Sequence, residues 1–270
     1  MNSERFWKIV KIYNNLMREA IEGPNCTDLS ICHGDCCSIK IDVPKILAEE
    51  YIRRGHATTD DFIRSNIFSL HLRFNDKTGK CFLFDKKING CSVHGSGIKP
   101  PQCWIYPTNF SIPKNEEIRC KKVSGWKIVD KEKAEKAELL LKEYITFCEN
   151  EANDEILKIG ERISEKSLKK IMKDTPPSHL AGFIDTWDEI KLLSAEGFSL
   201  QMKRFCKKYN TACPILENDF MNCKSICEEV RNGLISFLQK ILIRFINDKG
   251  PDVCGNYPLY SLSNFYPFFF

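Results

Sequence analysis

The chain has 270 residues, of which 43% are hydrophobic and 28% charged, which is typical of a folded globular protein and excludes a disordered or fibrous one. A formal net charge of +4 with no dense basic block argues against a nucleic-acid partner. The N-terminus lacks the apolar core of a signal peptide, and no run approaches the roughly 18–20 apolar residues that span a bilayer. We therefore expect a cytoplasmic protein of one domain or two small ones.

The first 112 residues are expected to combine helices with a long loop region. Apolar residues at helical spacing predict an amphipathic helix over residues 5–21. A second helix is expected over residues 44–54, with Pro44 in its first turn, and a short third one over residues 59–75. Turn residues recur throughout residues 76–112, which predicts few regular elements there.

The remainder is expected to be helical. A charged helix over residues 131–173 has one apolar stripe that should be buried: Leu139, Leu140, Ile145, Phe147, Ile156, Leu157, Ile159 and Ile163. Two prolines make residues 174–178 the best candidate for a linker. Further helices are expected over residues 187–193 and 198–208, with a buried one over residues 234–246.

These elements predict a mainly α protein in which a loop-rich cysteine-cluster region packs with a helical C-terminal region. We place a metal-binding domain with its N-terminal helix in residues 1–125, and a helical region with an aromatic tail in residues 126–270. The tail is expected to dock on the protein's own core or to cover the cysteine cluster, and a partner or membrane contact is the alternative. Asp185, Asp188 and Glu189 around Trp187 resemble an exposed helix surface more than an acid–base pair.

Fourteen cysteines are the most informative feature of the chain. Four lie within twelve residues and three more follow: Cys26, Cys32, Cys36, Cys37, Cys81, Cys91 and Cys103. Thiols this close are usually shared by a disulfide, by Zn²⁺ or by an iron–sulfur cluster. Disulfides are rare in a reducing cytosol, so metal or cluster binding is favoured. Adjacent side chains diverge, so we do not expect Cys36 and Cys37 to bind the same metal.

Other cysteines form weaker candidates. A second set of four thiols, a candidate second metal site, lies at Cys206, Cys213, Cys223 and Cys227. The spacing of the last two predicts that they share one helix face, one turn apart. Core cysteines or a disulfide pair are the alternatives. Cys120 is either an eighth N-terminal ligand or a buried apolar cysteine.

Motifs of common enzyme classes are not found. The sequence has no nucleophile elbow, no phosphate-binding loop and no dinucleotide-binding glycine motif, so hydrolase and nucleotide-dependent functions lack support. Among the histidines, His33 lies beside the cysteines and is a candidate ligand or proton carrier, whereas His179 follows two prolines and is expected to be exposed.

Four segments carry a family resemblance. The run C-x5-C-x3-CC from Cys26, the segment around Cys81, the segment 91–94 and the segment 99–107 together resemble the YkgJ-type cysteine-cluster family, described as zinc- or iron-chelating. The resemblance covers residues 24–112. This sequence departs from the family's pattern at three positions, with His94 in place of tyrosine and Lys99 and Trp104 in place of arginine. At His94 we therefore expect a structural hydrogen bond.

The run is also similar to the cysteine region of flagellin lysine methylases, in which C-x3-CC is followed shortly by Ile-Asp, here Ile41-Asp42. This similarity implies a [4Fe–4S] cluster and an S-adenosylmethionine-dependent protein lysine methyltransferase, although no glycine-rich methyl-donor loop is visible. Together the resemblances imply that the seven N-terminal cysteines supply the ligands, with zinc as the alternative metal. The implied functions are an accessory or electron-transfer module with a protein partner, or a methyltransferase with a protein substrate.

Overall fold

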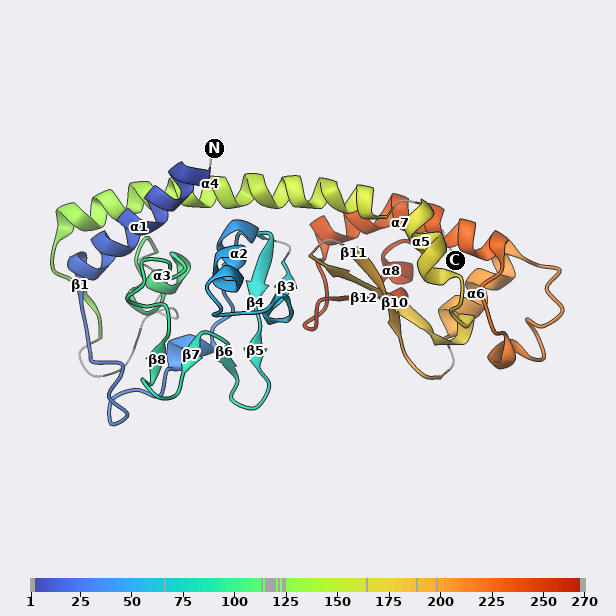
Figure 1. Ribbon diagram of the computed structural model, residues 1–270, viewed down its shortest axis with the longest axis horizontal. Coiled ribbons are helices and arrows are strands. Elements are labelled where there is room, and N and C mark those ends of the chain that lie inside the picture. Colours follow the sequence, from blue (N-terminus) through green and yellow to red (C-terminus); the bar gives the residue numbers. More distant parts are fainter. Residues whose placement is uncertain are drawn as a thin grey trace. The chain divides into compact units, whose positions relative to one another are not determined.

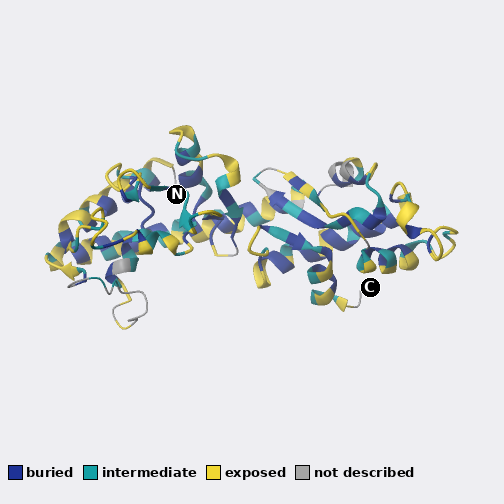
Figure 2. Cartoon of the chain, turned by 90° about the horizontal axis from the view of Figure 1, so that it is seen from below, coloured by how far each residue is buried: buried dark blue, intermediate teal, exposed yellow. Residues whose placement is uncertain are grey.

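The computed structural model describes residues 3–65, 67–112, 114, 120, 122, 125–163, 165–187, 189–197 and 199–267 (Figure 1). The chain divides into two compact units. Unit 1 comprises Met1–Ile63 and Ile67–Ala152, and unit 2 comprises Arg64–Asn66 and Asn153–Phe270. The described elements are mainly helical, as expected. Buried residues run through the interior of each unit, and exposed ones occupy the outer turns and loops (Figure 2).

The helices of unit 1 largely follow the sequence pattern. They are α1 (Ser3–Ala20), α2 (Lys45–Arg53), α3 (Gln102–Thr108) and the first part of α4 (Lys131–Arg162). The apolar stripe of α1 is buried, and its Phe6 ring lies 4.6 Å from the ring of Phe147 on α4, centre to centre. Glu151 of α4 accepts hydrogen bonds from the first two backbone N–H groups of α2, those of Lys45 and Ile46, and so caps this helix.

Short strands take the place of the helix expected over residues 59–75, so that prediction was wrong. Only a 3₁₀ turn forms there, η2 (Thr59–Asp61). β3 (Phe62–Arg64) and β4 (Leu70–Leu72) follow and form a three-stranded sheet with β2 (Asp42–Val43). Backbone pairing with β2, more than twenty-five residues away in sequence, overrides the local apolar spacing.

The remaining strands of unit 1 are two residues long. β5 (Phe74–Asn75) pairs with β6 (Lys80–Cys81), and β7 (Phe84–Asp85) with β8 (Gly90–Cys91). β1 (Ile21–Glu22) pairs with β9 (Lys127–Ile128). The β5–β6 and β7–β8 hairpins fold the loop-rich region around the cysteines.

The predicted buried stripe of α4 was partly wrong. Leu139 and Leu157 are 63% and 68% exposed, whereas Ile159 and Ile163 are buried as expected. The face that packs in unit 1 consists mainly of small and aromatic residues: Ala134, Ala137, Leu141, Tyr144, Cys148 and Ala152. Alanines bury little area individually, so a pattern of large apolar residues misidentifies the packing face.

Unit 2 surrounds a sheet of three strands in the order β11 (Glu189–Ser194), β10 (Leu180–Thr186), β12 (Asn256–Pro258). The helix expected over residues 187–193 is instead part of the β10–β11 hairpin, which Trp187 joins with a positive φ of 21°. The helices of this unit are α5 (Glu165–Met172), α6 (Leu200–Tyr209), α7 (Glu228–Asp248) and α8 (Leu259–Phe265). They confirm the helices expected over residues 198–208 and 234–246.

The boundary between the units lies within α4, at Ala152 and Asn153, and not near residue 125 or in residues 174–178. Pro177 and Ser178 are buried in a 3₁₀ turn, η4 (Pro177–His179), because this segment packs as part of unit 2. No helix in the described part of the chain is both long and apolar enough to cross a membrane.

The aromatic tail docks on the core of unit 2 over its described residues, as expected. Tyr257 is fully buried, and the ring centres of Phe245 and Phe265 lie 5.3 Å apart, edge to face. Phe268, Phe269 and Phe270 lie outside the described residues.

Asp185 was expected on a helix surface, but it is a buried strand residue. Its Oδ2 accepts a hydrogen bond of 2.7 Å from Nε of Arg64. The side chains of Arg64 and Asp185 are 1% and 0% exposed. Nη2 of Arg162 lies 3.2 Å from the other carboxylate oxygen. Glu189 is exposed, and Asp188 lies outside the described residues.

Candidate metal centre

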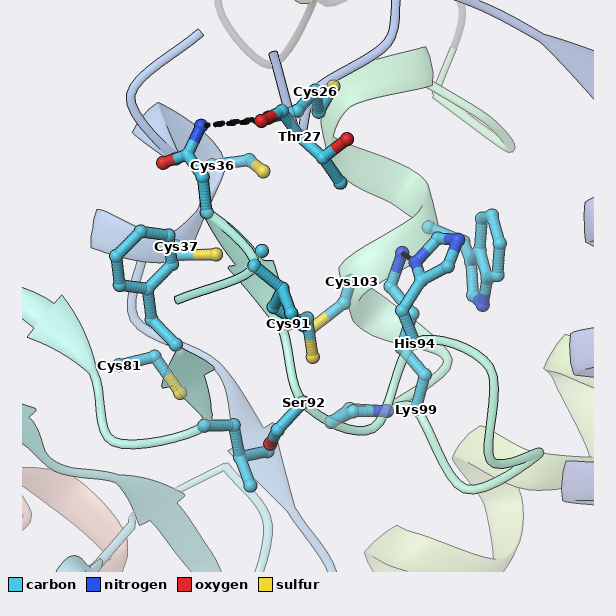
Figure 3. A pocket seen from close by; sticks show the side chains of 18 of the residues that line it. Cys26, Thr27, Cys36, Cys37, Cys81, Cys91, Ser92, His94, Lys99 and Cys103 are labelled. Atoms are coloured by element: carbon cyan, nitrogen blue, oxygen red, sulfur yellow. Dashed lines mark hydrogen bonds between the residues drawn. The ribbon is translucent and has the colours of Figure 1, made fainter. Parts of the chain in front are cut away.

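Six cysteines of unit 1 line one cavity of about 480 Å³ (Figure 3): Cys26, Cys36, Cys37, Cys81, Cys91 and Cys103. They come from segments that are up to 77 residues apart in the chain. The tertiary structure thus brings together six of the seven candidates. The seventh, Cys32, is 4% exposed and does not line the cavity.

Cys36 and Cys37 belong to a short 3₁₀ helix, η1 (Asp35–Ser38). Gly34 precedes it with a φ of 70°, and the Cys37 N–H donates to its carbonyl at 2.9 Å. A Cβ at Gly34 would clash with the ring of Phe84. Both the left-handed backbone and the close ring require glycine here, so the turn that presents the cysteine pair depends on this residue.

Two hairpins present Cys81 and Cys91 in the same way. Cys81 of β6 lies opposite Phe74, and Cys91 of β8 lies opposite Phe84. The Ser92 N–H donates to the carbonyl of Leu83 at 2.8 Å. This bond extends the pairing of β7 with β8 by one residue on each strand. Each cysteine thus has a phenylalanine as its cross-strand neighbour.

Cys103 lies in the first turn of α3, and α1 holds the segment before it. Nδ2 of Asn14 donates to the Lys99 carbonyl at 3.0 Å, and the Asn14 Oδ1 accepts from Nε1 of Trp104 at 2.9 Å. The hydroxyl of Tyr51 donates to the carbonyl of Ile98 at 2.6 Å. The cysteine is therefore fixed from both sides by buried polar side chains of the helical scaffold.

Asn89 connects the cysteine-rich loop to the β7–β8 hairpin. It has a φ of 46°, and its Nδ2 donates to the carbonyl of Cys32 at 2.8 Å and lies 3.3 Å from that of Cys26. No spacing rule in the sequence points to this asparagine, because its partners are backbone atoms more than fifty residues earlier.

The adjacent thiols of Cys36 and Cys37 act on each other's pKa. Interaction with Cys37 lowers the pKa of Cys36, and the charge of Lys99 lowers it further. The same interaction raises the pKa of Cys37, and burial and repulsion from Cys36, Cys91 and Cys81 add to this rise. A thiolate is therefore favoured at Cys36.

Lys99 supplies positive charge at the cavity and is 8% exposed. Its Nζ lies 3.6 Å from the centre of the Trp104 ring and 3.4 Å from Nδ1 of His94. Burial raises the pKa of Cys91 and Cys103, and the Lys99 charge opposes this rise. Lys99 thus stabilises negative charge on the cavity cysteines.

A second group of thiols adjoins the first. Burial raises the pKa of Cys26 to about 12, and the nearby charges of Cys32, Cys36 and Cys120 add to this rise. Cys120 is half-buried and does not line the cavity. Cys26 thus lies near Cys32, Cys36 and Cys120.

The cavity cysteines are not grouped tightly enough, as they stand, to hold one metal ion. Among the described residues, no three Cys, His, Asp or Glu side chains are grouped tightly enough to hold a single metal ion. With Zn–S bonds near 2.3 Å, four thiolates around Zn²⁺ lie only about 3.8 Å apart. An iron–sulfur cluster binds each thiolate at a different iron and so takes thiolates from a wider cavity.

The histidines differ from one another in environment. His33 is exposed, and His179 is half-buried rather than exposed. The His94 ring packs on Trp104 with centres 5.1 Å apart, and its nitrogen lies by Lys99, in agreement with the structural contact expected. The sequence did not single out His71, which is buried, and whose Nδ1 has no hydrogen-bond partner among the described residues.

The second cysteine set also converges, but differently from expectation. Cys206, Cys213, Cys223 and Cys227 line a cavity of about 40 Å³ in unit 2. Cys223 follows the 3₁₀ turn η5 (Phe220–Asn222), and Cys227 is the N-cap of α7. The prediction that these two share a helix face was wrong, because the helix begins only after Cys227.

Comparison with known proteins adds no relative. No family model, no curated protein and no solved structure matches this chain.

Proposed function

We propose that unit 1 binds one [4Fe–4S] cluster and that the protein is an accessory or electron-transfer module acting with a protein partner. The observation that carries the proposal is the convergence of six cysteines on one cavity of about 480 Å³ with Lys99 at its wall. A cluster of this kind supplies one-electron transfer when bound.

Four of the six cysteines are proposed as ligands: Cys37, Cys81, Cys91 and Cys103. In Figure 3 these side chains surround one part of the cavity, whereas Cys36 lies on the side of Cys26 and Thr27. Cys36 then stands beside the cluster as a neighbouring thiol.

The surrounding residues have definable roles in this proposal. Lys99 offsets the negative charge that four thiolates bring into a half-buried site. Phe84, opposite Cys91, lines the cavity beside it. Asn14 and Tyr51 hold the segment that carries Cys103, and Asn89 joins the hairpin of Cys91 to the loop that begins at Cys26.

Metal analysis of protein purified without air tests the proposal. We expect iron and acid-labile sulfide, with a broad absorbance near ~400 nm. Cys81→Ser and Cys91→Ser should lose most of the iron, whereas Cys36→Ser and the buried α4 variant Cys148→Ser should retain it. A colourless protein whose unit 1 cysteines hold zinc instead would reject iron in favour of the alternative metal.

A protein lysine methyltransferase is the second candidate, because a cavity of this volume is also in the size range of small-molecule sites. Trp104 and Trp126 contribute to its lining and offer aromatic surface to a ligand. Calorimetric titration with S-adenosylmethionine separates the two functions. Saturable binding would favour the enzyme, and no heat of binding would favour the module.

A further inference from the structure

Unit 2 contains a second convergence of thiols that the proposed cluster does not use. Cys206, Cys213, Cys223 and Cys227 line one cavity together with apolar residues, among them Leu216 and Phe220. We propose that these four cysteines bind one Zn²⁺ ion in a structural site. This proposal is independent of the cluster in unit 1.

The four cysteines come from elements that the chain brings together around one loop. Cys206 is buried on α6, and the Asn210 N–H donates to its carbonyl at 2.8 Å at the end of that helix. The N–H of Cys213 donates to the Asn210 carbonyl at 3.2 Å, and that of Cys223 to the Phe220 carbonyl at 3.2 Å. Cysteines in turns of this kind can direct their sulfurs toward a common centre.

Two features of the fold suit a ligand sulfur at Cys227. Cys227 is the N-cap of α7, a helix of 21 residues whose N-terminal dipole favours negative charge beside it. Nδ2 of Asn210 lies 3.4 Å from Sγ of Cys227 and donates to it. A side-chain donor to a ligand sulfur is the outer-shell contact that orients thiolates and reduces their charge in metal sites.

The four sulfurs are not grouped tightly enough to hold a metal ion as they stand, so binding requires them to close around it. The small cavity favours a single ion over a cluster. Its volume of about 40 Å³ is less than a tenth of the 480 Å³ of the unit 1 cavity. A zinc ion with Zn–S bonds near 2.3 Å would fit this cavity once the four sulfurs close around it. Sγ of Cys223 now donates to the Ser225 carbonyl at 3.3 Å, and it would exchange this bond for the metal on deprotonation.

The site would stabilise the segment between α6 and α7. Between Tyr209 and Glu228, its regular structure within the described residues is the three-residue turn η5. Several of its apolar side chains remain exposed, Ile215 at 39% and Met221 at 49%. A metal that joins both ends of such a loop offsets the entropy of ordering it, so zinc would raise the stability of unit 2.

Zinc analysis of the full-length protein, purified anaerobically under reducing conditions, tests this inference. We expect Cys223→Ser and Cys227→Ser each to lose about one zinc per chain relative to wild type. Cys254→Ser, an exposed cysteine outside the set, should lose none. Unchanged zinc in both variants would overturn the inference.

A second measurement covers variants that fail to fold. Chelator-treated wild-type protein is titrated with Co²⁺, which should give the visible bands of tetrahedral thiolate coordination and be displaced by one equivalent of Zn²⁺. Wild-type protein that binds neither ion, or that has a disulfide within this set after anaerobic purification, would refute the site. Cys81→Ser should leave this zinc in place, so failure of the iron proposal and failure of the zinc proposal give different results.

Discussion

Nζ of Lys99 lies 3.6 Å from the centre of the Trp104 ring, and both residues belong to the segment that carries Cys103. The two residues thus form a buried cation–π pair. The pair keeps a positive charge at the wall of the cysteine cavity, where no carboxylate is found among the described lining residues.

We predict that Lys99→Met makes the reduction potential of the proposed cluster more negative. Reduction adds an electron to an anionic centre, and removing a nearby cation makes that step less favourable, by on the order of 50 mV. Lys99→Arg keeps the charge and should remain close to wild type. Redox titration of anaerobic protein measures the shift, and equal potentials in wild type and Lys99→Met would contradict the role of Lys99.

Gly34→Ala should destabilise unit 1 and lower its iron content. Gly55→Ala is the matched control, because the two glycines have φ values of 70° and 73°, but only the Cβ at Gly34 meets another group within 4 Å. Both variants incur the left-handed backbone cost of roughly 1 kcal/mol. Only Gly34→Ala adds a clash with Phe84, so it should lose more thermal stability. Iron retained equally in both variants would show that the Gly34 turn does not position Cys37.

Arg64→Met should cost unit 2 about 3 kcal/mol of unfolding free energy, because it leaves the Asp185 carboxylate buried with one cation fewer. Arg244→Met is the control on an exposed pair with Asp248 of the same unit, where exposed pairs contribute less than about 1 kcal/mol. Chemical denaturation, monitored through hydrogen exchange of the β10 amides, measures the loss of unfolding free energy in both variants. Similar losses in the two variants would mean that the buried pair contributes no more than a surface pair.

The buried His71 should make stability fall with decreasing pH. Burial, with the charge of Lys40, lowers the pKa of His71 to about 4, compared with about 6.5 in an unfolded chain. Between these values the unfolded state binds a proton that the folded state does not, so stability declines as the pH falls from about 6.5 toward about 4. The contribution of His71 is complete above this window and lost below it.

His71→Gln isolates this contribution, since glutamine does not titrate. The difference in unfolding free energy between wild type and His71→Gln should change by about 2 kcal/mol between pH 7 and pH 4, in favour of the variant at low pH. Denaturant melts at several pH values measure it. A difference that is constant across this range would exclude His71 as the titrating group.

The sequence alone determined the helices with strong apolar periodicity. α1, α2 and α7 form where the spacing places them, because one continuous face of each is buried whatever its partner. The cysteine spacing likewise marked the segments that carry the thiols, and six of the seven N-terminal candidates line one cavity. Turns and hairpins are short-range features, so local spacing indicates them but not which thiols meet.

Only the tertiary structure decided the strands, the packing face of α4 and the partners of the cysteines. β4 forms because it pairs with β2, and α4 packs through alanines while Leu139 and Leu157 face solvent. Asn89 and the Arg64–Asp185 pair act through contacts between residues distant in the chain. Lys99 acts through its contact with the ring of Trp104, five residues later. Such contacts arise from long-range packing and leave no periodic signal in the sequence.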